Sequence, residues 1–249
     1  MPSASRTKER LDQHLVRVGL AESRERAKRL ILAGEVRVGT EVLDKPSTMV
    51  LADAEVSVKE RPKYVGRGGL KLEGALDTFG IDPQGKVCFD AGASTGGFTD
   101  CLLQKGAAKV YAYDVGTNQL VWKLRSDPRV VVREKFNVRH MVPEDVGEMV
   151  DLVVLDVSFI SLTLILPTSW KILKPTGSVV CLIKPQFELA RDDVGKGGIV
   201  RDPELRERAV AKIQQFAETS LQAHWRDVID SPITGTDGNH EYLAWLQPT

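Results

Sequence analysis

The sequence has few cysteines, and none stands in a pattern that binds a metal or forms disulfides. Its 249 residues include only Cys88, Cys101 and Cys181, which are widely spaced and form no C-x-x-C pair. An odd and scattered set argues against both a disulfide framework and a zinc site. Each of the three lies in or beside an apolar run, so we expect buried free thiols in a reducing compartment and no bound metal.

The sequence also lacks a segment suited to entering or crossing a membrane. Its N-terminal stretch, MPSASRTKERLDQHL, is charged and contains no apolar core of a signal peptide. The longest apolar stretch, residues 150–167, contains Asp151 and Asp156 and ends at a proline, which argues against a membrane span. We therefore expect a cytoplasmic protein with no membrane partner.

Net charge is absent as well, but the charged residues are unevenly distributed. The whole chain has 34 Lys+Arg and 34 Asp+Glu, whereas residues 1–71 contain 15 of the former and 10 of the latter. The rest of the chain therefore has a net charge of −5, and this distribution favours a polyanion that approaches from the N-terminal side. A hydrophobic content of 42% and this length predict one globular core plus a small module.

Residues 1–60 are expected to form that module, with two helices followed by a small hairpin. Apolar residues recur at helical spacing within residues 6–21, which predicts a first helix. Ser23 is a candidate N-cap for a second helix, and we expect that helix to end near Gly34. Residues 35–44 alternate around a Gly-Thr turn, which predicts a hairpin, and a further strand follows.

The second helix of this module has a high density of positive charge, and the hairpin adds to it. Such a face can neutralise several phosphates. The alternative is a solvated helix face on which Glu22 and Glu25 are internal partners. The run SRERAKRLILAGEVRVGTEVLDKPS resembles the S4 RNA-binding domain, and the resemblance implies RNA contacts. The residues that we assign to them here are Arg6, Arg24, Arg26, Lys28, Arg29 and Arg37.

A basic, glycine-rich linker, residues 61–69, follows the module. The sequence RPKYVGRGGLK contains no acidic residue, and its proline and glycines predict a bend or hinge. Its basic side chains extend the positive region towards the rest of the chain. We therefore add Arg61, Lys63 and Arg67 to the expected RNA contacts.

From residue 70 to 249 strand-like and helix-like segments alternate, which predicts a second domain of the α/β class. Short Val-rich runs are separated by helical stretches, and this pattern indicates parallel strands with right-handed crossovers. The expected parallel strands are residues 86–90, 109–115, 129–134, 151–157 and 178–184, and the helical stretches include 98–106, 118–126 and 158–174. Two later runs, 224–233 and 239–247, predict a terminal hairpin with one antiparallel member.

The first strand of this domain ends in DAGASTGGFTD, a glycine-rich turn that leads into a helix. Ligands of such sheets bind at the carboxyl ends of the strands, beside a helix N-terminus. The spacing G-x-x-x-G-G differs from the G-x-G-x-x-G typical of a pyrophosphate site. Asp90 leads the turn, where a carboxylate can meet the amino group of a methionine moiety.

Two further polar residues follow the next strands. Asp114 ends the second strand, where an acid can bind ribose hydroxyls, and Asn137 follows the third, where an amide can reach an adenine edge. S-adenosylmethionine is therefore the expected cofactor. The alternative is that Asp90 and Asp114 only cap helices. The expected cofactor-binding residues are Asp90, Gly92, Ser94, Thr95, Gly96, Gly97, Phe98, Asp114 and Asn137.

Four charged residues are candidates for catalysis because each lies at the end of an expected element. Lys71 opens the helix before the first strand, Asp156 and Lys184 end the fourth and fifth strands, and Glu241 lies in the last strand. If the sheet has the expected order, all four point into one pocket above the methyl group of the cofactor. The set resembles the Lys–Asp–Lys–Glu tetrad of FtsJ-like 2′-O-ribose methyltransferases. The alternative is a surface salt-bridge network.

The resemblance implies that this tetrad activates a ribose hydroxyl. Methyl transfer needs the hydroxyl close to the sulfonium and in line with it, and negative charge grows on the oxygen as its proton leaves. Lys184 can stabilise that charge or accept the proton, and both roles stay open. The fourth strand is followed by Asp-Val-Ser-Phe and lacks the (N/D)-P-P-(Y/F) motif of adenine N-methyltransferases, which argues against a flipped base.

The segment GKGGIVRDPELRERAV, after the fifth strand, reads as a flexible loop followed by a helix from about Pro203. Its glycines and Lys196 predict a lid over substrate or cofactor, and the alternative is an ordinary connection.

Taken together, the S4-like module, DAGASTGGFTD, IKPQFE and GKGGIVRDP resemble the TlyA-type rRNA methyltransferases, also called the hemolysin A family. The resemblance covers nearly the whole chain. It implies a Rossmann-like S-adenosylmethionine-dependent methyltransferase sandwich with a small N-terminal α+β S4 domain. The implied activity is 2′-O-methylation of a nucleotide, cytidine by the resemblance, in the ribosomal RNA of ribosomal subunits. The alternatives are a catalytically silent ribosome-assembly factor and a membrane-lytic protein.

Overall fold

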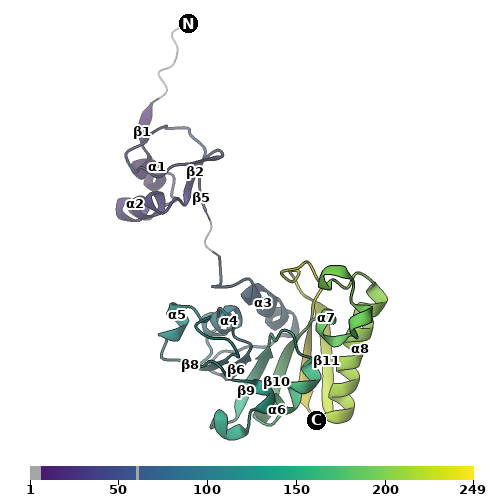
Figure 1. Ribbon diagram of the computed structural model, residues 1–249. Helices are drawn as coiled ribbons and strands as arrows, with labels where there is room; N and C mark the ends of the chain where they lie inside the picture. The colour runs from purple at the N-terminus through teal and green to yellow at the C-terminus, as the bar shows by residue number, and fades with distance from the viewer. Residues whose placement is uncertain (1–6, 60–61) are drawn as a thin grey trace. The chain divides into compact units, whose positions relative to one another are not determined.

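The computed structural model describes residues 7–59 and 62–249, which belong to two compact units, Met1–Arg61 and Pro62–Thr249 (Figure 1). The positions of the two units relative to each other are not determined.

The N-terminal unit consists of two helices and two small sheets. Helix α1 spans Leu11–Arg17 and α2 spans Arg24–Leu32. A three-stranded sheet has the order β3-β2-β5, and a second sheet pairs β1 with β4. The strands are β1 (Lys8–Arg10), β2 (Val36–Val38), β3 (Glu41–Val42), β4 (Met49–Leu51) and β5 (Val56–Val58).

Local sequence signals explain most of this unit. The Ser23 side chain accepts a hydrogen bond of 3.2 Å from the Arg26 amide, so it caps α2 as predicted. Gly34 follows α2 with φ +68°, and the hairpin pairs Arg37 with Val42 as the alternation predicts. The first helix is shorter than expected, because Lys8–Arg10 forms a strand instead. Those residues pair with Met49–Leu51, and a distant partner of this kind cannot be read from local periodicity.

The C-terminal unit is built on a seven-stranded sheet with the order β11-β12-β10-β9-β6-β7-β8. Strands β6 to β10 run parallel, and β12 is antiparallel to both of its neighbours, β10 and β11. The chain runs outwards from β6 to β8 and then returns to β9 beside β6, which places the switch point between β6 and β9. The strands are β6 (Val87–Ala91), β7 (Lys109–Tyr113), β8 (Val130–Arg133), β9 (Val150–Leu155), β10 (Leu173–Ile183), β11 (Ala223–Asp230) and β12 (Tyr242–Pro248).

Helices cover both faces of this sheet (Figure 1). On one face α3 (Gly68–Phe79) and α4 (Gly97–Gln104) pack through residues such as Leu72 and Leu102. On the other face α6 (Leu166–Trp170) and α8 (Pro203–Ser220) pack through Leu166 and Ile213. The strands are apolar on both sides. Within β9, Leu152 packs in the core under α3 and α4, and Val153 packs in the core under α6 and α8. This is the predicted α/β sandwich.

Two segments that were expected to be mostly helical contain little helix. Within residues 118–126 only α5, Trp122–Arg125, is helical. Residues 158–174 form the 3₁₀ turn η3 (Leu162–Leu164) and α6, which has Pro167 in its first turn. Both segments follow strands at the edge of the sheet where ligands bind in this class of fold. They are largely loop there, although their apolar residues recur at helical spacing.

The three cysteines are free and buried, as predicted. Within residues 7–59 and 62–249 no helix is long and apolar enough to cross a membrane. Those residues contain no cluster of three or more His, Cys, Asp or Glu side chains suited to a metal ion.

Candidate active site

The glycine-rich turn after β6 lies against the end of β9 at the switch point. Gly92 has φ +85°, and a Cβ atom there would lie 2.5 Å from the carbonyl oxygen of Asp156. Only glycine therefore allows the two strand ends to approach this closely. A Cβ atom on Gly97, at the start of α4, would lie 2.9 Å from the Gly69 amide nitrogen. The turn thus brings β9 and the start of α3 together around one space.

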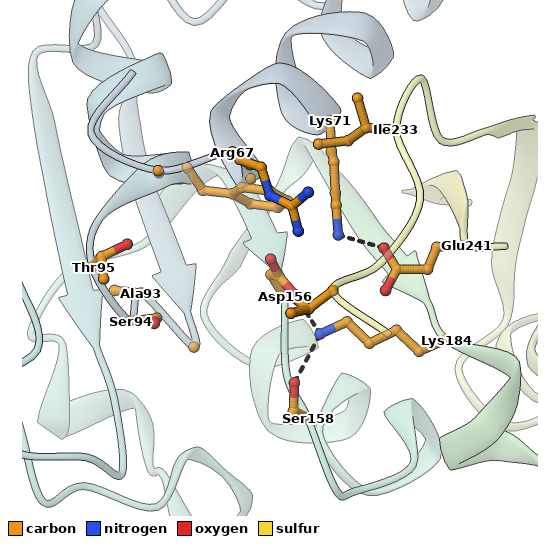
Figure 2. Close-up of a pocket in the computed structure, with 16 residues that line it drawn as sticks. Arg67, Lys71, Ala93, Ser94, Thr95, Asp156, Ser158, Lys184, Ile233 and Glu241 are labelled. Carbon is orange, nitrogen blue, oxygen red and sulfur yellow. Dashed lines mark hydrogen bonds and ion pairs between the residues drawn. The ribbon is translucent and has the colours of Figure 1, made fainter. Parts of the chain in front are cut away.

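The four predicted catalytic residues converge on that space (Figure 2). They come from four separate places: the first turn of α3, the residue after β9, the residue after β10 and the residue before β12. Together with the glycine-rich turn they border a cavity of about 320 Å³, here called the tetrad cavity. Its side chains include Lys71, Asp156, Lys184 and Glu241. Glu241 differs slightly from its prediction, because β12 begins only at Tyr242.

The tetrad forms two lysine–carboxylate pairs. Lys71 Nζ forms an ion pair with Glu241 Oε2, and Lys184 Nζ lies 2.6 Å from Asp156 Oδ1. Lys184 Nζ also donates a hydrogen bond of 2.8 Å to Ser158 Oγ (Figure 2). Lys71, Lys184 and Glu241 are only 8%, 9% and 4% exposed, so these are not pairs on an open surface. Asp156 is more accessible, at 23% of its side chain. Buried charges require partners of this kind, and the low exposure of the other three residues argues against a fully solvated network.

A second cavity, of about 350 Å³, adjoins the first and shares Gly92, Ser94, Asp156 and Ser158 with it. We call it the Asp114 cavity. Asp114 Oδ2 accepts a hydrogen bond of 2.8 Å from the Ser94 amide, so the carboxylate also fixes the glycine-rich turn. The lining also includes the apolar side chains of Phe136, Val138, Ile160 and Ile165. A cavity lined by a carboxylate and by apolar side chains can accept a ligand that has both hydroxyl groups and an apolar ring.

The predicted cofactor-binding residues divide into those that border these cavities and those that do not. Gly92, Ser94, Thr95, Gly97, Phe98, Asp114 and Asn137 border one or both cavities. The Asn137 side-chain oxygen is already engaged, because it accepts a hydrogen bond of 3.0 Å from the Arg139 amide and caps the 3₁₀ turn η1, Val138–His140. Only its amide nitrogen is left for an adenine edge.

Asp90 and Gly96 border neither cavity. Asp90 is fully buried and accepts a hydrogen bond of 2.6 Å from Thr99 Oγ1, so it supports α4 from beneath the turn. Burial raises the pKa of the Asp90 carboxyl to about 7. A Cβ atom on Gly96 would lie 2.2 Å from Leu124 Cδ1, so this glycine permits close packing under the turn. Both residues thus support the turn, and their contact with the cofactor stays a prediction.

Sequence reasoning missed the residues just beyond Asp156. Phe159 has φ +63° and is 90% exposed, and its ring centroid lies 5.1 Å from that of Phe187 in α7 (Pro185–Glu188). It borders both the Asp114 cavity and a third cavity of about 420 Å³, which we call the outer cavity. The sequence shows that Ser158 and Phe159 lie shortly after β9, which ends at Leu155, but it does not show the exposure of Phe159 beside two cavities.

The basic residues of the N-terminal unit agree only in part with their prediction. Lys28 pairs with Glu25 at 3.6 Å, which is one of the internal partners that the alternative expected, whereas Arg24 pairs with Asp12 of α1 at 3.0 Å. Arg29 and Arg37 are exposed and have no ion pair within residues 7–59, while Arg26 is half-buried. Arg6 lies outside the described residues.

The basic residues of the linker also differ among themselves. Lys63 pairs with Glu73. Arg67 is exposed and borders the tetrad cavity, and Figure 2 shows its guanidinium group directed into the space between Lys71 and Asp156. Arg61 lies outside the described residues.

The strand order and the cleft at the switch point define the fold of S-adenosylmethionine-dependent methyltransferases. A candidate enzyme of that class from Listeria monocytogenes has the same fold, with a TM-score of 0.53 and 16% identity over 74% of this chain and all of that one. The FtsJ-like methyltransferase model matches residues 64–248, and the S4 domain model matches residues 9–56. The chain therefore belongs to the FtsJ-like methyltransferase family, with an S4 domain at its N-terminal end, as the resemblance predicted.

Three proteins illustrate this relationship over most of the chain. The 16S/23S rRNA (cytidine-2′-O)-methyltransferase TlyA of Mycobacterium tuberculosis is 48% identical, over 96% of this chain and 89% of its own length. Hemolysin A of Brachyspira hyodysenteriae is 48% identical, over 94% of this chain and 98% of its own length. The solved structure of a hemolysin candidate from Streptococcus thermophilus has a TM-score of 0.74 and 46% identity, and the match covers 98% of this chain and 90% of that one.

Proposed function

We propose that this chain transfers the methyl group of S-adenosylmethionine to a ribose 2′-hydroxyl of ribosomal RNA, with cytidine as the acceptor nucleoside. The observation that carries the proposal is the convergence of two buried lysine–carboxylate pairs beside the glycine-rich turn. The nucleoside and the RNA are taken from the mycobacterial relative that is 48% identical.

The two adjoining cavities fit the two halves of the cofactor. The adenosine is assigned to the Asp114 cavity, with its ribose at Asp114 and its base against Phe136 and Ile160. The methionine half is assigned to the tetrad cavity, beside Thr95 and Gly97. The cofactor supplies a methyl group on a positively charged sulfur, so the acceptor oxygen must approach that carbon from the side opposite the sulfur.

The tetrad is suited to hold and activate a hydroxyl at that position. Lys184 as an ammonium group has three N–H donors, of which Asp156 and Ser158 receive two. The third can point to the ribose oxygen and stabilise its growing negative charge. With Lys184 in its ammonium form, the hydroxyl proton passes to the Asp156 carboxylate as the oxygen–carbon bond forms and the carbon–sulfur bond breaks. Lys71, held by Glu241, adds a second positive charge near the oxygen.

The RNA is assigned to three groups of residues. Phe159 is exposed and borders the outer cavity, as Lys184 does, so its ring can stack on the base of the acceptor nucleotide. Arg67 can reach its phosphate, since it borders the tetrad cavity without an ion pair in the described part of the chain. Arg29 and Arg37 in the S4 domain are free to contact phosphates elsewhere on the RNA.

The test is single-turnover methyl transfer from tritiated S-adenosylmethionine to ribosomal subunits. We expect Lys184→Ala to reduce the rate by about 100-fold or more, because a transition-state donor of this kind contributes that much. Binding of the cofactor and of the subunits should change little. The matched control is Lys171→Ala, which removes an exposed lysine that borders none of the three cavities. An unchanged rate in Lys184→Ala would remove the catalytic assignment.

The same assay separates this proposal from a catalytically silent assembly factor. Such a factor would bind subunits without incorporating label, and Lys184→Ala would then behave like the wild type. The intact tetrad favours the enzyme, because three buried charged side chains and the half-buried Asp156 at one cavity are more than a protein that only binds RNA through its surface requires.

A further inference from the structure

One buried side chain ties together two segments that are distant in the sequence. Asn239 is 1% exposed and lies in the segment before β12. Its Oδ1 accepts a hydrogen bond of 2.9 Å from the Val200 amide, and its Nδ2 donates one of 2.8 Å to the Gly198 carbonyl oxygen. A carboxamide is suited to this link because it presents an acceptor and a donor side by side. The glycine-rich loop after α7 is thereby fixed to the segment that bears Glu241.

The segment around Asn239 also covers the tetrad. The Gly235 amide donates a hydrogen bond of 2.9 Å to the Asn239 carbonyl oxygen, which closes a tight turn. A Cβ atom on Gly235 would lie 2.6 Å from Glu241 Oε1, so the turn rests directly on the carboxylate that pairs with Lys71. Any movement of this turn would therefore reach the catalytic residues.

The outer cavity lies between these two loops and Lys184. Gly198 borders it from one loop, and Gly235 and Thr236 border it from the other. It shares Ser158, Lys184, Thr236 and Glu241 with the tetrad cavity, so the two spaces meet at the catalytic residues. Its volume of about 420 Å³ lies within the range of small-molecule sites and suits a nucleoside.

We propose that the outer cavity receives the acceptor nucleoside, and that Asn239 is a positioning residue that holds the two loop walls of this cavity together. The inference rests on the proposed function, since it takes RNA as the methyl acceptor. It goes further because it assigns the acceptor nucleoside to the outer cavity. It also gives a role to Asn239, a residue expected to touch neither the cofactor nor the RNA.

The loop that Asn239 holds is anchored at its end by the buried Val200 and has a backbone hydrogen bond of 3.0 Å from Gly198 to Gly195, but its two central glycines are not held by packing. Gly197 and Gly198 have φ +78° and +74°, and a Cβ atom on either would meet nothing within 4 Å, so side-chain packing does not fix them. Methyl transfer is sensitive to small displacements of the acceptor, because the oxygen must stay in line with the sulfonium. Loss of the link should therefore slow transfer. It should not weaken cofactor binding, since none of these loop residues borders the Asp114 cavity.

The first test compares Asn239→Ala with His240→Ala in the full-length protein. We expect Asn239→Ala to lower kcat/KM for ribosomal subunits by about tenfold or more, which corresponds to the loss of a buried hydrogen-bonded pair. The Kd for S-adenosylmethionine should stay within about twofold of the wild-type value, and the Val200 amide should exchange its hydrogen faster. His240 is exposed on the same segment, and its substitution should alter none of these quantities.

The second test uses Asn239→Asp, because the introduced carboxyl has the same shape but donates to the Gly198 carbonyl only when protonated. Burial favours its protonated form, so the activity of this variant relative to wild type should rise as the pH falls. The same ratio for Asn239→Ala should stay flat. The charged or titratable side chains of the two loops and of α8 are the same in the wild type and in both Asn239 variants: Arg191, Asp192, Asp193, Lys196, Arg201, Asp202, Glu204, Arg206, Glu207, Arg208, Lys212, Glu218, Asp237, His240 and Glu241.

Wild-type kinetics in Asn239→Ala would overturn the inference, as would an equal loss of cofactor affinity, which would indicate general unfolding of the site. A flat activity ratio for Asn239→Asp would remove the role of the Gly198 hydrogen bond. Failure of the proposed function gives a different result: the wild type itself would transfer no methyl group to RNA, and the acceptor assignment would fall with it. Amide exchange at Val200 would still test the link between the loops.

Discussion

At the residue scale, the site depends on carboxylates whose surroundings differ sharply. Asp156 and Glu241 each have a lysine partner at the tetrad cavity. Asp114 accepts hydrogen bonds from the backbone amides of Ser94 and Gly116. Asp90 has only the Thr99 hydroxyl, and its other oxygen has no hydrogen-bond partner in the described part of the chain. These four carboxylates should therefore respond differently to substitution.

The ribose assignment of Asp114 predicts a loss of cofactor affinity on substitution. Asp114→Ala removes a charged hydrogen-bond acceptor for the ribose and also the acceptor of the Ser94 amide. A hydrogen bond to a charged group contributes about 1.5–3 kcal/mol, so the Kd for S-adenosylmethionine should rise by about 10-fold to 150-fold. Isothermal titration calorimetry measures this directly. Asp192→Ala, an exposed residue away from both cofactor cavities, serves as the control, and equal affinities in the two variants would contradict the assignment.

The raised pKa of Asp90 predicts a stability that falls with pH. The folded-state pKa is about 7 against an ordinary value of 3.8, so the folded protein holds this proton more tightly than the unfolded chain does. The resulting stabilisation is complete below about pH 4 and is lost as the pH rises through 7. Relative to Asp90→Asn, the wild type should lose up to about 4 kcal/mol of unfolding free energy over that interval. Urea unfolding of both proteins across this range measures it, and parallel profiles would show that Asp90 does not titrate there.

At the element scale, the glycine-rich turn after β6 depends on close packing against neighbouring elements. The glycine-rich turn has two glycines with positive φ that face different neighbours: Gly92 the end of β9, and Gly96 the leucines at α5. Neither position offers room for a side chain. The turn therefore depends on packing from beneath as much as on the ligand above it.

This packing predicts that Gly96→Ala is more damaging than a glycine substitution that only strains the backbone. A Cβ atom on Gly96 would lie 2.2 Å from Leu124 Cδ1, whereas one on Gly147, also at positive φ, would meet nothing within 4 Å. Gly147→Ala should cost about 1 kcal/mol of stability from backbone conformation alone. Gly96→Ala should cost about 1–3 kcal/mol more, because the leucines must move, and it should weaken cofactor binding. Thermal unfolding and calorimetry compare the two; equal effects would contradict the packing argument.

The elements themselves were largely predictable, because their signals are local. Val-rich runs marked the parallel strands of the large sheet, Ser23 marked the start of α2, and helix α8 begins at Pro203 as expected. The failures occurred where partners lie far away in the sequence. Strand β1 forms because it pairs with β4, and residues 158–174 form loops around the ligand side instead of one helix.

The charged residues of the candidate site were predictable from the sequence, whereas the residues that line or support its cavities were not. Strand ends at a switch point collect ligand-binding side chains, so Asp156 and Lys184 could be found from their positions alone. Phe159 and Asn239 could not, because their importance depends on exposure beside a cavity in one case and on two hydrogen bonds to a distant loop in the other.

At the scale of the whole molecule, the two units divide the work between RNA binding and chemistry. The S4 unit has its own apolar core, formed by residues such as Leu11, Leu15 and Ile31. It presents Arg29 and Arg37 without ion pairs in the described part of the unit. The larger unit holds the tetrad and the two cavities to which we assign the cofactor.

This division predicts that the double substitution Arg29→Gln with Arg37→Gln weakens RNA binding alone. Removal of one phosphate-binding arginine should lower the slope of log K against log salt by about 0.7 to 0.9, hence by roughly 1.4 to 1.8 for the pair. Affinity for S-adenosylmethionine should not change, because neither residue belongs to the unit that holds the cofactor cavities. Filter binding of ribosomal RNA at several salt concentrations measures the slope, with Lys45→Gln, an exposed residue of the same unit, as the control. An unchanged slope would contradict the phosphate assignment.

The position of the methyl group on the RNA tests the central claim most directly. Wild-type protein and Lys184→Ala are incubated with ribosomal subunits and labelled S-adenosylmethionine, and the labelled RNA is digested with alkali, which cannot cleave beside a 2′-O-methylated ribose. The account predicts that the wild-type label is recovered in alkali-resistant dinucleotides that contain cytidine, and that Lys184→Ala gives almost none. Label on a base, or equal labelling by the two proteins, would contradict it.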